Sequence, residues 1–204
     1  MSLRRRFTRP LGERRYSKLF IVATEGEITE PQYFDLFNEK QSRIKVQCIK
    51  RGQGNTPAGV LRRMSVYLRQ EGLKKEDEAW LVVDKDQWSD DELRLLFNWS
   101  LKEDNYGFAL SNPKFEFWLL LHFDDGDGIR TPRECDERLS RYLHDYDKRI
   151  DHRRFNHQCI NEAIRRARAR DTPPCHDWPR MAGSTVYRLV QSILDCQTGR
   201  SHAN

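Results

Sequence analysis

Residues 79–86 read Ala-Trp-Leu-Val-Val-Asp-Lys-Asp, and this stretch decides the fold. Its first five residues are all apolar, which is typical of a strand buried on both faces of a parallel sheet. Two carboxylates, Asp84 and Asp86, follow the strand directly. Because ligands of α/β proteins bind beyond the carboxyl ends of parallel strands, we expect both aspartates to line a functional crevice.

Strand-like and helix-like patterns alternate on both sides of this stretch. Thr29 is suited to cap one helix, with Pro31 in its first turn, and Thr56 is suited to cap the next. The alternation predicts an α/β domain with a mainly parallel sheet of about four strands flanked by helices. We expect strands at residues 17–24, 44–50, 79–83 and 106–110, and helices at 29–37, 57–71, 89–102 and 112–122.

The pattern changes after the acidic, glycine-containing loop at residues 124–128. From there on it predicts only helices, at about 131–146, 156–170 and 184–196. We therefore expect three parts, which are a basic arm (1–15), an α/β domain (16–128) and a helical extension packed on the sheet (129–204).

A further acidic residue, Glu25, follows the first expected strand, and Gly26 permits a sharp turn there. Glu25, Asp84 and Asp86 should meet at one edge of the sheet. Crowded carboxylates repel each other unless a hard cation such as Mg²⁺ or Mn²⁺ binds their oxygens. The pattern favours a metal site made of these three residues, and the alternative is a set of solvated turns.

Glu116 lies in a stretch, residues 115–121, whose other members are all phenylalanine, tryptophan or leucine. A helix without a polar face is buried on nearly all sides. Burying an unpaired carboxylate costs roughly several kcal/mol, and the helix dipole returns only about 0.3–1 kcal/mol. Two interpretations stay open: Glu116 is a metal ligand or general base, or it pairs with an arginine.

The chain has a net charge of +5, and its basic residues cluster near both ends. Such clusters suit contacts with phosphate groups, although a solvated tail and a solvated helix face would have the same composition. Binding to nucleic acid, DNA or RNA, is therefore expected. The candidate phosphate contacts are Arg4, Arg5, Arg6, Arg51, Lys85, Lys114, Arg165 and Arg166.

Several classes of protein are disfavoured. The five cysteines are scattered and form no C-x₂-C pair, which argues against a disulfide framework and a zinc ribbon. No apolar run approaches the ~20 residues that span a bilayer, and the N-terminal arginines precede no signal-peptide core. We expect a cytoplasmic protein without membrane contact, and a homo-oligomer stays open.

Three stretches in this order resemble the RloB family, and a fourth resembles it more weakly. The first three include Glu25, the Asp84 and Asp86 pair, and Glu116. The stretches are residues 25–34, 82–86, 111–123 and, more weakly, 183–190.

This resemblance implies a divergent branch of the topoisomerase–primase (Toprim) fold, in which a strand-end glutamate and an Asp-x-Asp pair bind divalent metal. Carried over, Glu25 is the glutamate and Asp84 and Asp86 are the pair. Glu116 matches the RloB motif without a secure Toprim counterpart. The resemblance also implies a role in bacterial defence against phages or mobile elements, beside an ATPase partner.

Three functions follow as hypotheses. The leading one is a Mg²⁺- or Mn²⁺-dependent nuclease in which Glu25, Asp84, Asp86 and Glu116 are catalytic and the first three bind the metal. The second is a non-catalytic Toprim-like module that binds nucleic acid or an ATPase, which retention of the carboxylates disfavours. The third is a primase- or topoisomerase-like transferase, for which no tyrosine has a suitable context.

Overall fold

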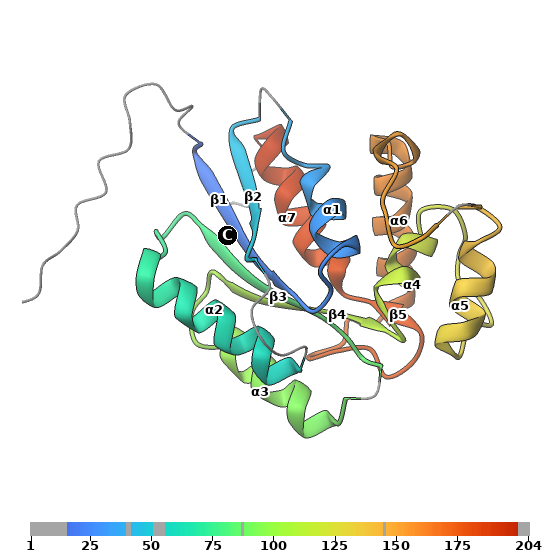
Figure 1. Ribbon diagram of the computed structural model, residues 1–204, viewed down its shortest axis with the longest axis horizontal. Helices are drawn as coiled ribbons and strands as arrows, with labels where there is room; N and C mark the ends of the chain where they lie inside the picture. Colours follow the sequence, from blue (N-terminus) through green and yellow to red (C-terminus); the bar gives the residue numbers. More distant parts are fainter. Residues whose placement is uncertain (1–15, 40–41, 51–55, 87, 145, 200–204) are drawn as a thin grey trace, which may run out of the picture.

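A five-stranded sheet with the order β2-β1-β3-β4-β5 forms the centre of the computed structural model (Figure 1). The structure describes residues 16–39, 42–50, 56–86, 88–144 and 146–199. The first four strands are parallel, and β5 runs antiparallel to β4. The strands are β1 (Lys18–Thr24), β2 (Ile44–Cys48), β3 (Glu78–Asp84), β4 (Tyr106–Asn112) and β5 (Gly183–Ser184).

Helices cover both faces of this sheet (Figure 1). Those on one face are α2 (Pro57–Glu71) and α3 (Asp90–Ser100), and those on the other include α1 (Thr29–Asp35), α4 (Phe115–Leu120), α6 (His157–Arg170) and α7 (Val186–Thr198). The remaining described elements are α5 (Pro132–Leu139) and a short 3₁₀ turn, η1 (His152–Arg154).

Alternation along β1 explains why the sheet has two apolar faces. Phe20 and Val22 pack against the α1, α4 and α7 side, whereas Ile21 and Ala23 pack against α2 and α3. All four side chains are fully buried, which matches the continuous apolar sequence expected of a central parallel strand. The α/β architecture is therefore confirmed, and it is consistent with the expected Toprim-like fold.

The expected order of strands and helices through residue 122 is also confirmed. Of the two predicted helix caps, one is confirmed and the other is wrong. Thr56 caps α2, because its Oγ1 accepts a hydrogen bond from the Gly59 N–H at 3.2 Å. Thr29 does not cap α1, since Ile28 occupies that position. The Thr29 hydroxyl instead donates to the Lys148 backbone oxygen at 2.9 Å.

Two expectations beyond residue 128 are wrong. The predicted all-helical region contains β5, which is too short to produce a periodic pattern but is held by a 2.9 Å hydrogen bond between the hydroxyls of Ser184 and Ser111. The helix expected at 131–146 ends at Leu139, because the N–H groups of Arg141 and Tyr142 bond carbonyls three residues back instead of four. None of the helices in the described ranges is long and apolar enough to cross a membrane.

Candidate acidic site at the carboxyl edge of the sheet

A cavity of about 470 Å³ lies where β1, β3 and β4 end. Two of the residues that line it are lysines, Lys114 and Lys148. The sequence prediction that Glu25, Asp84, Asp86 and Glu116 lie together agrees with this arrangement. The carboxylates that line the cavity are Glu25, Glu27, Glu30, Asp84, Asp86 and Glu116.

Glu25 is held in place by the strand next to β1. Its Oε2 accepts a hydrogen bond from the Asp84 N–H at 3.2 Å, and the Trp88 indole N–H lies 3.1 Å from Oε1. Burial nevertheless raises the pKa of this carboxyl to about 7, with the negative charges of Glu30 and Asp86 adding to the effect. Glu25 can therefore exchange a proton near neutral pH.

Asp84 is the last residue of β3, and the pKa of its carboxyl group is raised. Burial raises its pKa well above the ordinary value, and the charges of Glu30, Glu25 and Glu116 raise it further. The Phe115 N–H donates to this carboxylate and opposes the shift. Asp84 thus sits where negative charge is least tolerated without a cation.

Asp86 lies at the rim of the same cavity. It is exposed, and its φ of 24° ends the extended conformation that would have placed it in line with Asp84. Its N–H donates to the Pro113 oxygen at 2.9 Å, which joins the end of β3 to the start of α4. Both aspartates line the cavity, but Asp84 is half-buried and Asp86 is exposed.

Glu30 belongs to the site although the sequence did not single it out. Its side chain is 5% exposed, and its Oε1 accepts a hydrogen bond from the Gly26 N–H at 2.8 Å. Burial raises its pKa, and the charge of Glu116 adds to the effect. A Cβ on Gly26 would lie 2.1 Å from Glu30 Oε2, so the glycine is required for this approach.

An acid in the first turn of a helix is ordinary, because it interacts favourably with the helix dipole. Glu30 therefore carried no special signal. One sequence feature could have indicated that Glu30 turns toward the site: a glycine, Gly26, follows the end of a strand and precedes this carboxylate by four residues.

Glu116 is 6% exposed at the start of α4, whose other residues are all buried. The Tyr146 hydroxyl donates to its Oε1 at 3.1 Å, and Lys114 Nζ lies 3.8 Å from its Oε2. The arginine pair considered as an alternative is not found among the described residues. The partners of the Glu116 carboxylate are instead Tyr146 and Lys114.

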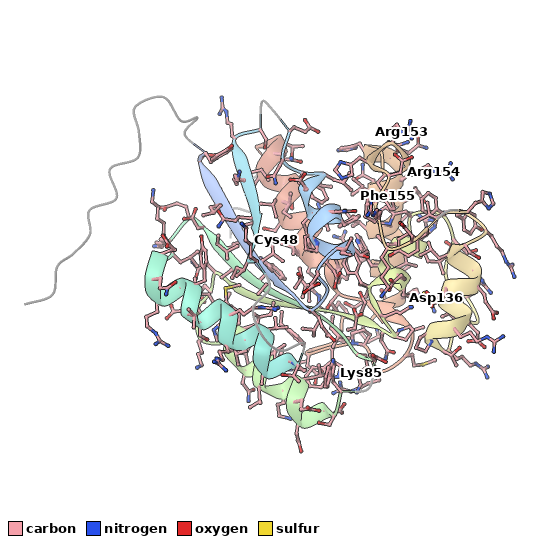
Figure 2. The ribbon with its side chains drawn as sticks, viewed as in Figure 1. Cys48, Lys85, Asp136, Arg153, Arg154 and Phe155 are labelled. Atoms are coloured by element: carbon pink, nitrogen blue, oxygen red, sulfur yellow. The ribbon has the colours of Figure 1, made fainter. Side chains whose placement is uncertain are left out.

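The predicted phosphate contacts have different environments. Lys114 lines the cavity and bonds Asp136 of α5 at 2.7 Å. Asp136 is labelled in Figure 2. Lys85, also labelled in Figure 2, donates to the Trp88 oxygen at 2.5 Å and lies 3.3 Å from Asp90, so it holds the chain that enters α3.

The remaining predicted contacts lie elsewhere. Arg165 pairs with Glu162 on the same helix at 2.9 Å. Arg166 pairs with Asp125 at 2.8 Å and donates to the Leu121 oxygen at 2.9 Å. Neither lines the acidic cavity. Four candidates fall outside the described residues: Arg4, Arg5, Arg6 and Arg51.

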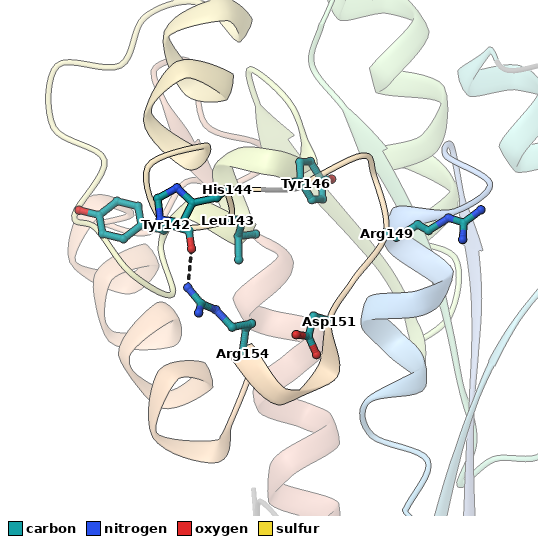
Figure 3. A pocket seen from close by; sticks show the side chains of 7 residues that line it. All are labelled: Tyr142, Leu143, His144, Tyr146, Arg149, Asp151 and Arg154. Carbon is teal, nitrogen blue, oxygen red and sulfur yellow. Dashed lines mark hydrogen bonds between the residues drawn. The ribbon is translucent and has the colours of Figure 1, made fainter.

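A second cavity, of about 190 Å³, is bordered by the residues after α5 (Figure 3). Arg154 donates to the Tyr142 oxygen there at 2.5 Å. Tyr146 lines this second cavity while its hydroxyl reaches Glu116. Tyr146 therefore connects the second cavity to a carboxylate of the first.

The donor chemistry of the acidic cavity fits a hard divalent cation, because Mg²⁺ and Mn²⁺ prefer carboxylate oxygens. Three of the carboxyls, those of Glu25, Glu30 and Asp84, have raised pKa values that a nearby cation would lower. In the described ranges, no three histidine, cysteine or carboxylate side chains are close enough to hold one ion as they stand. The oxygen ligands are of the right chemical kind, but the described side chains are too far apart to bind one ion without moving.

A comparison with protein-family models matches the RloB-like proteins over residues 20–193. The chain belongs to the RloB-like family. The match runs from β1 into α7 and includes every carboxylate of the acidic cavity. The expected family is thus confirmed, whereas descent of this RloB-like chain from the Toprim branch stays a prediction. Neither the curated proteins nor the solved structures contain a match.

The stability of this RloB-like protein is expected to depend on pH through Glu25. In the unfolded chain Glu25 ionises near its ordinary pKa of 4.5, and in the folded protein near 7. Between these values the folded state binds the extra proton, so the free energy of unfolding falls as pH rises through this window. The Glu25→Gln variant lacks this titration. Its free energy of unfolding relative to that of the wild type should therefore rise by up to about 3 kcal/mol between pH 4.5 and pH 8.

Urea unfolding in EDTA across this range measures the difference. Glu103→Gln, at an exposed residue, serves as the control. The buried His122, whose pKa burial lowers to about 3, titrates in all three proteins and cancels from the comparison. Parallel stability curves for the wild type and Glu25→Gln would contradict the raised pKa of Glu25.

Proposed function

We propose that this chain is a Mg²⁺- or Mn²⁺-dependent nuclease that hydrolyses phosphodiester bonds of DNA or RNA. The observation that supports it best is the cavity at the sheet edge, which, among the described residues, is lined by six carboxylates and two lysines. Burial raises the pKa of Asp84 far above its ordinary value in that cavity. A protein that had no cation to bind would gain nothing from collecting these charges.

Asp84, Asp86 and Glu25 are the residues proposed to hold the metal. A bound divalent ion would polarise the phosphoryl group and lower the pKa of a bound water. Glu25 is the first candidate to accept the proton of the attacking water, because its carboxyl group lines the same cavity.

The other residues of the cavity act on the carboxylates or on the substrate. Tyr146 and Lys114 orient Glu116 through a hydrogen bond of 3.1 Å and an ion pair of 3.8 Å. Lys114 also lines the cavity, but its ammonium group already bonds Asp136 at 2.7 Å, so a phosphate would compete with that carboxylate for it. Glu116 is the second candidate to accept the proton of the attacking water.

Membership of the RloB-like family supports a wider proposal, in which the nuclease acts in bacterial defence against phages or mobile elements. The sequence contains no Walker motif, so ATP hydrolysis would be supplied by a partner protein. The predicted basic arm, residues 1–15, would add phosphate contacts, and it lies outside the described residues.

The second candidate function is a non-catalytic module that binds nucleic acid or the ATPase. It is favoured by one observation: within the described part of the chain, the carboxylates are not close enough to share an ion as they stand.

Cleavage assays separate the two candidates. The wild type is incubated with plasmid, single-stranded DNA, total RNA and transfer RNA, in Mg²⁺, in Mn²⁺ or in EDTA. The nuclease proposal expects metal-dependent shortening of at least one substrate and none in EDTA. Retention of a substrate on the protein without cleavage in either metal, alone or with the partner ATPase, would favour the binding module.

A further inference from the structure

Many arginines of the C-terminal part of this chain already pair with carboxylates. The distances are 2.9 Å between Arg165 and Glu162, 2.8 Å between Arg166 and Asp125, and 2.7 Å between Arg170 and Asp127. A phosphate that approaches such an arginine competes with the carboxylate and is repelled by it. Clustered arginines in the sequence therefore do not by themselves make this face attractive to a polyanion.

A different face carries cations without such partners. Lys50 follows β2, and Arg62 lies in the second turn of α2. Both are exposed, and neither has a carboxylate partner within the ranges that the structure describes. Together with Arg63 they line a cavity of about 380 Å³ in which no described residue is acidic. Tyr67 and Gln70 add polar groups to the same wall.

A hydrogen bond from the wall of this basic cavity reaches the strand end that borders the acidic cavity. The Arg63 guanidinium donates to the backbone oxygen of Thr24. Thr24 is the last residue of β1 and directly precedes Glu25. A chain of phosphates that lies over the basic cavity can therefore continue toward the carboxylates at the same end of the sheet (Figure 1).

The other large cavity does not share this character. It has a volume of about 760 Å³ and lies at the opposite, amino edge of the sheet, near the start of β1 and β3. Three lysines line it, but so do five carboxylates. Its mixed charge gives a polyanion no net attraction.

We propose that the phosphodiester backbone of a nucleic acid binds across Lys50 and Arg62, in the cavity between the end of β2 and α2, and passes from there to the acidic site. The cleavage step rests on the proposed function, but the binding step does not. This surface replaces the predicted α6 arginines as the main phosphate contact of the folded part.

The test measures affinity in EDTA, where no metal-dependent cleavage occurs, with fluorescently labelled single-stranded DNA, single-stranded RNA and duplex DNA. The test variant is Lys50→Gln/Arg62→Gln. The control, Arg133→Gln/Arg165→Gln, removes the same charge from side chains that are 88% and 61% exposed and paired with carboxylates. All four substituted residues are exposed, and thermal melts verify that each variant folds.

The test variant should bind at least about 10-fold more weakly than the wild type, and the slope of log K against log salt should become shallower by about 1.5. Each single variant should give about half of that change in slope. The control should change affinity less than about 2-fold. Equal losses in both double variants, an unchanged test variant, or a wild type that binds none of the probes would overturn the proposal.

The outcomes also separate this inference from the proposed function. Binding that depends on Lys50 and Arg62, in a protein that cleaves nothing in Mg²⁺ or Mn²⁺, would support the surface and reject the nuclease. Cleavage by the wild type with undiminished binding of the test variant would reject only the surface.

Discussion

Replacing Asp84 by asparagine is expected to abolish metal-dependent cleavage while making the metal-free protein more stable. The side chain would keep its size, but the metal would lose a ligand worth several kcal/mol in the transition state, so we expect a loss of about 10³-fold or more. Stability should rise at pH 8, because burial and the charges of Glu30, Glu25 and Glu116 all oppose the ionised form of Asp84.

The two readouts together make this experiment informative. A thermal melt in EDTA and a cleavage assay in Mg²⁺ are carried out on Asp84→Asn and on Asp104→Asn, whose side chain is exposed and lines the cavity at the opposite edge. The control should resemble the wild type in both. A destabilised Asp84→Asn protein would point to a structural role for this carboxylate, and undiminished cleavage would remove Asp84 from the catalytic site.

Replacing Gly26 by alanine is expected to reduce cleavage strongly, by about 10²-fold or more, although it removes no carboxylate. Glu30 shares the cavity with the proposed metal ligands, and a misplacement of about 1 Å has effects of this size even when the mutated residue is remote from the chemistry. The new Cβ would lie 2.1 Å from Glu30 Oε2, so the Glu30 carboxyl must leave its position. The backbone of Gly26 is not in the left-handed region, so alanine introduces no strain of its own there.

A second substitution identifies the cause. Shortening the displaced side chain in Gly26→Ala/Glu30→Asp relieves the collision, so the double variant should be more stable than Gly26→Ala alone, which a double-mutant cycle of unfolding free energies measures. Independent, additive effects of the two substitutions would contradict the proposed packing of Gly26 against Glu30.

Much of the acidic site could be predicted from the sequence, because carboxylates that follow buried parallel strands meet at one edge of the sheet. Asp84 and Glu25 were found in this way, and the apolar surroundings of Glu116 identified that residue independently. Glu30 was missed because its inward direction depends on the absence of a side chain at Gly26, which is a three-dimensional condition.

Two further features could not be read from sequence patterns. The β5 strand is two residues long, and its pairing with β4 depends on hydroxyl contacts between residues 73 positions apart. The pairing of arginines with carboxylates is equally non-local, as the bond from Arg166 to Asp125 shows. A cluster of basic residues in a sequence shows where cations are, but it does not show which of them lack a carboxylate partner and can bind a phosphate.

The position of α7 has a consequence for how this protein can change over evolutionary time. Its buried residues Leu189, Val190 and Ile193 share one apolar core with β1 and α4, and Thr185 just before it bonds the Leu110 backbone. A recombination event with a breakpoint near residue 128 would expose that core on both sides. The acidic edge and the C-terminal helices must therefore be inherited together.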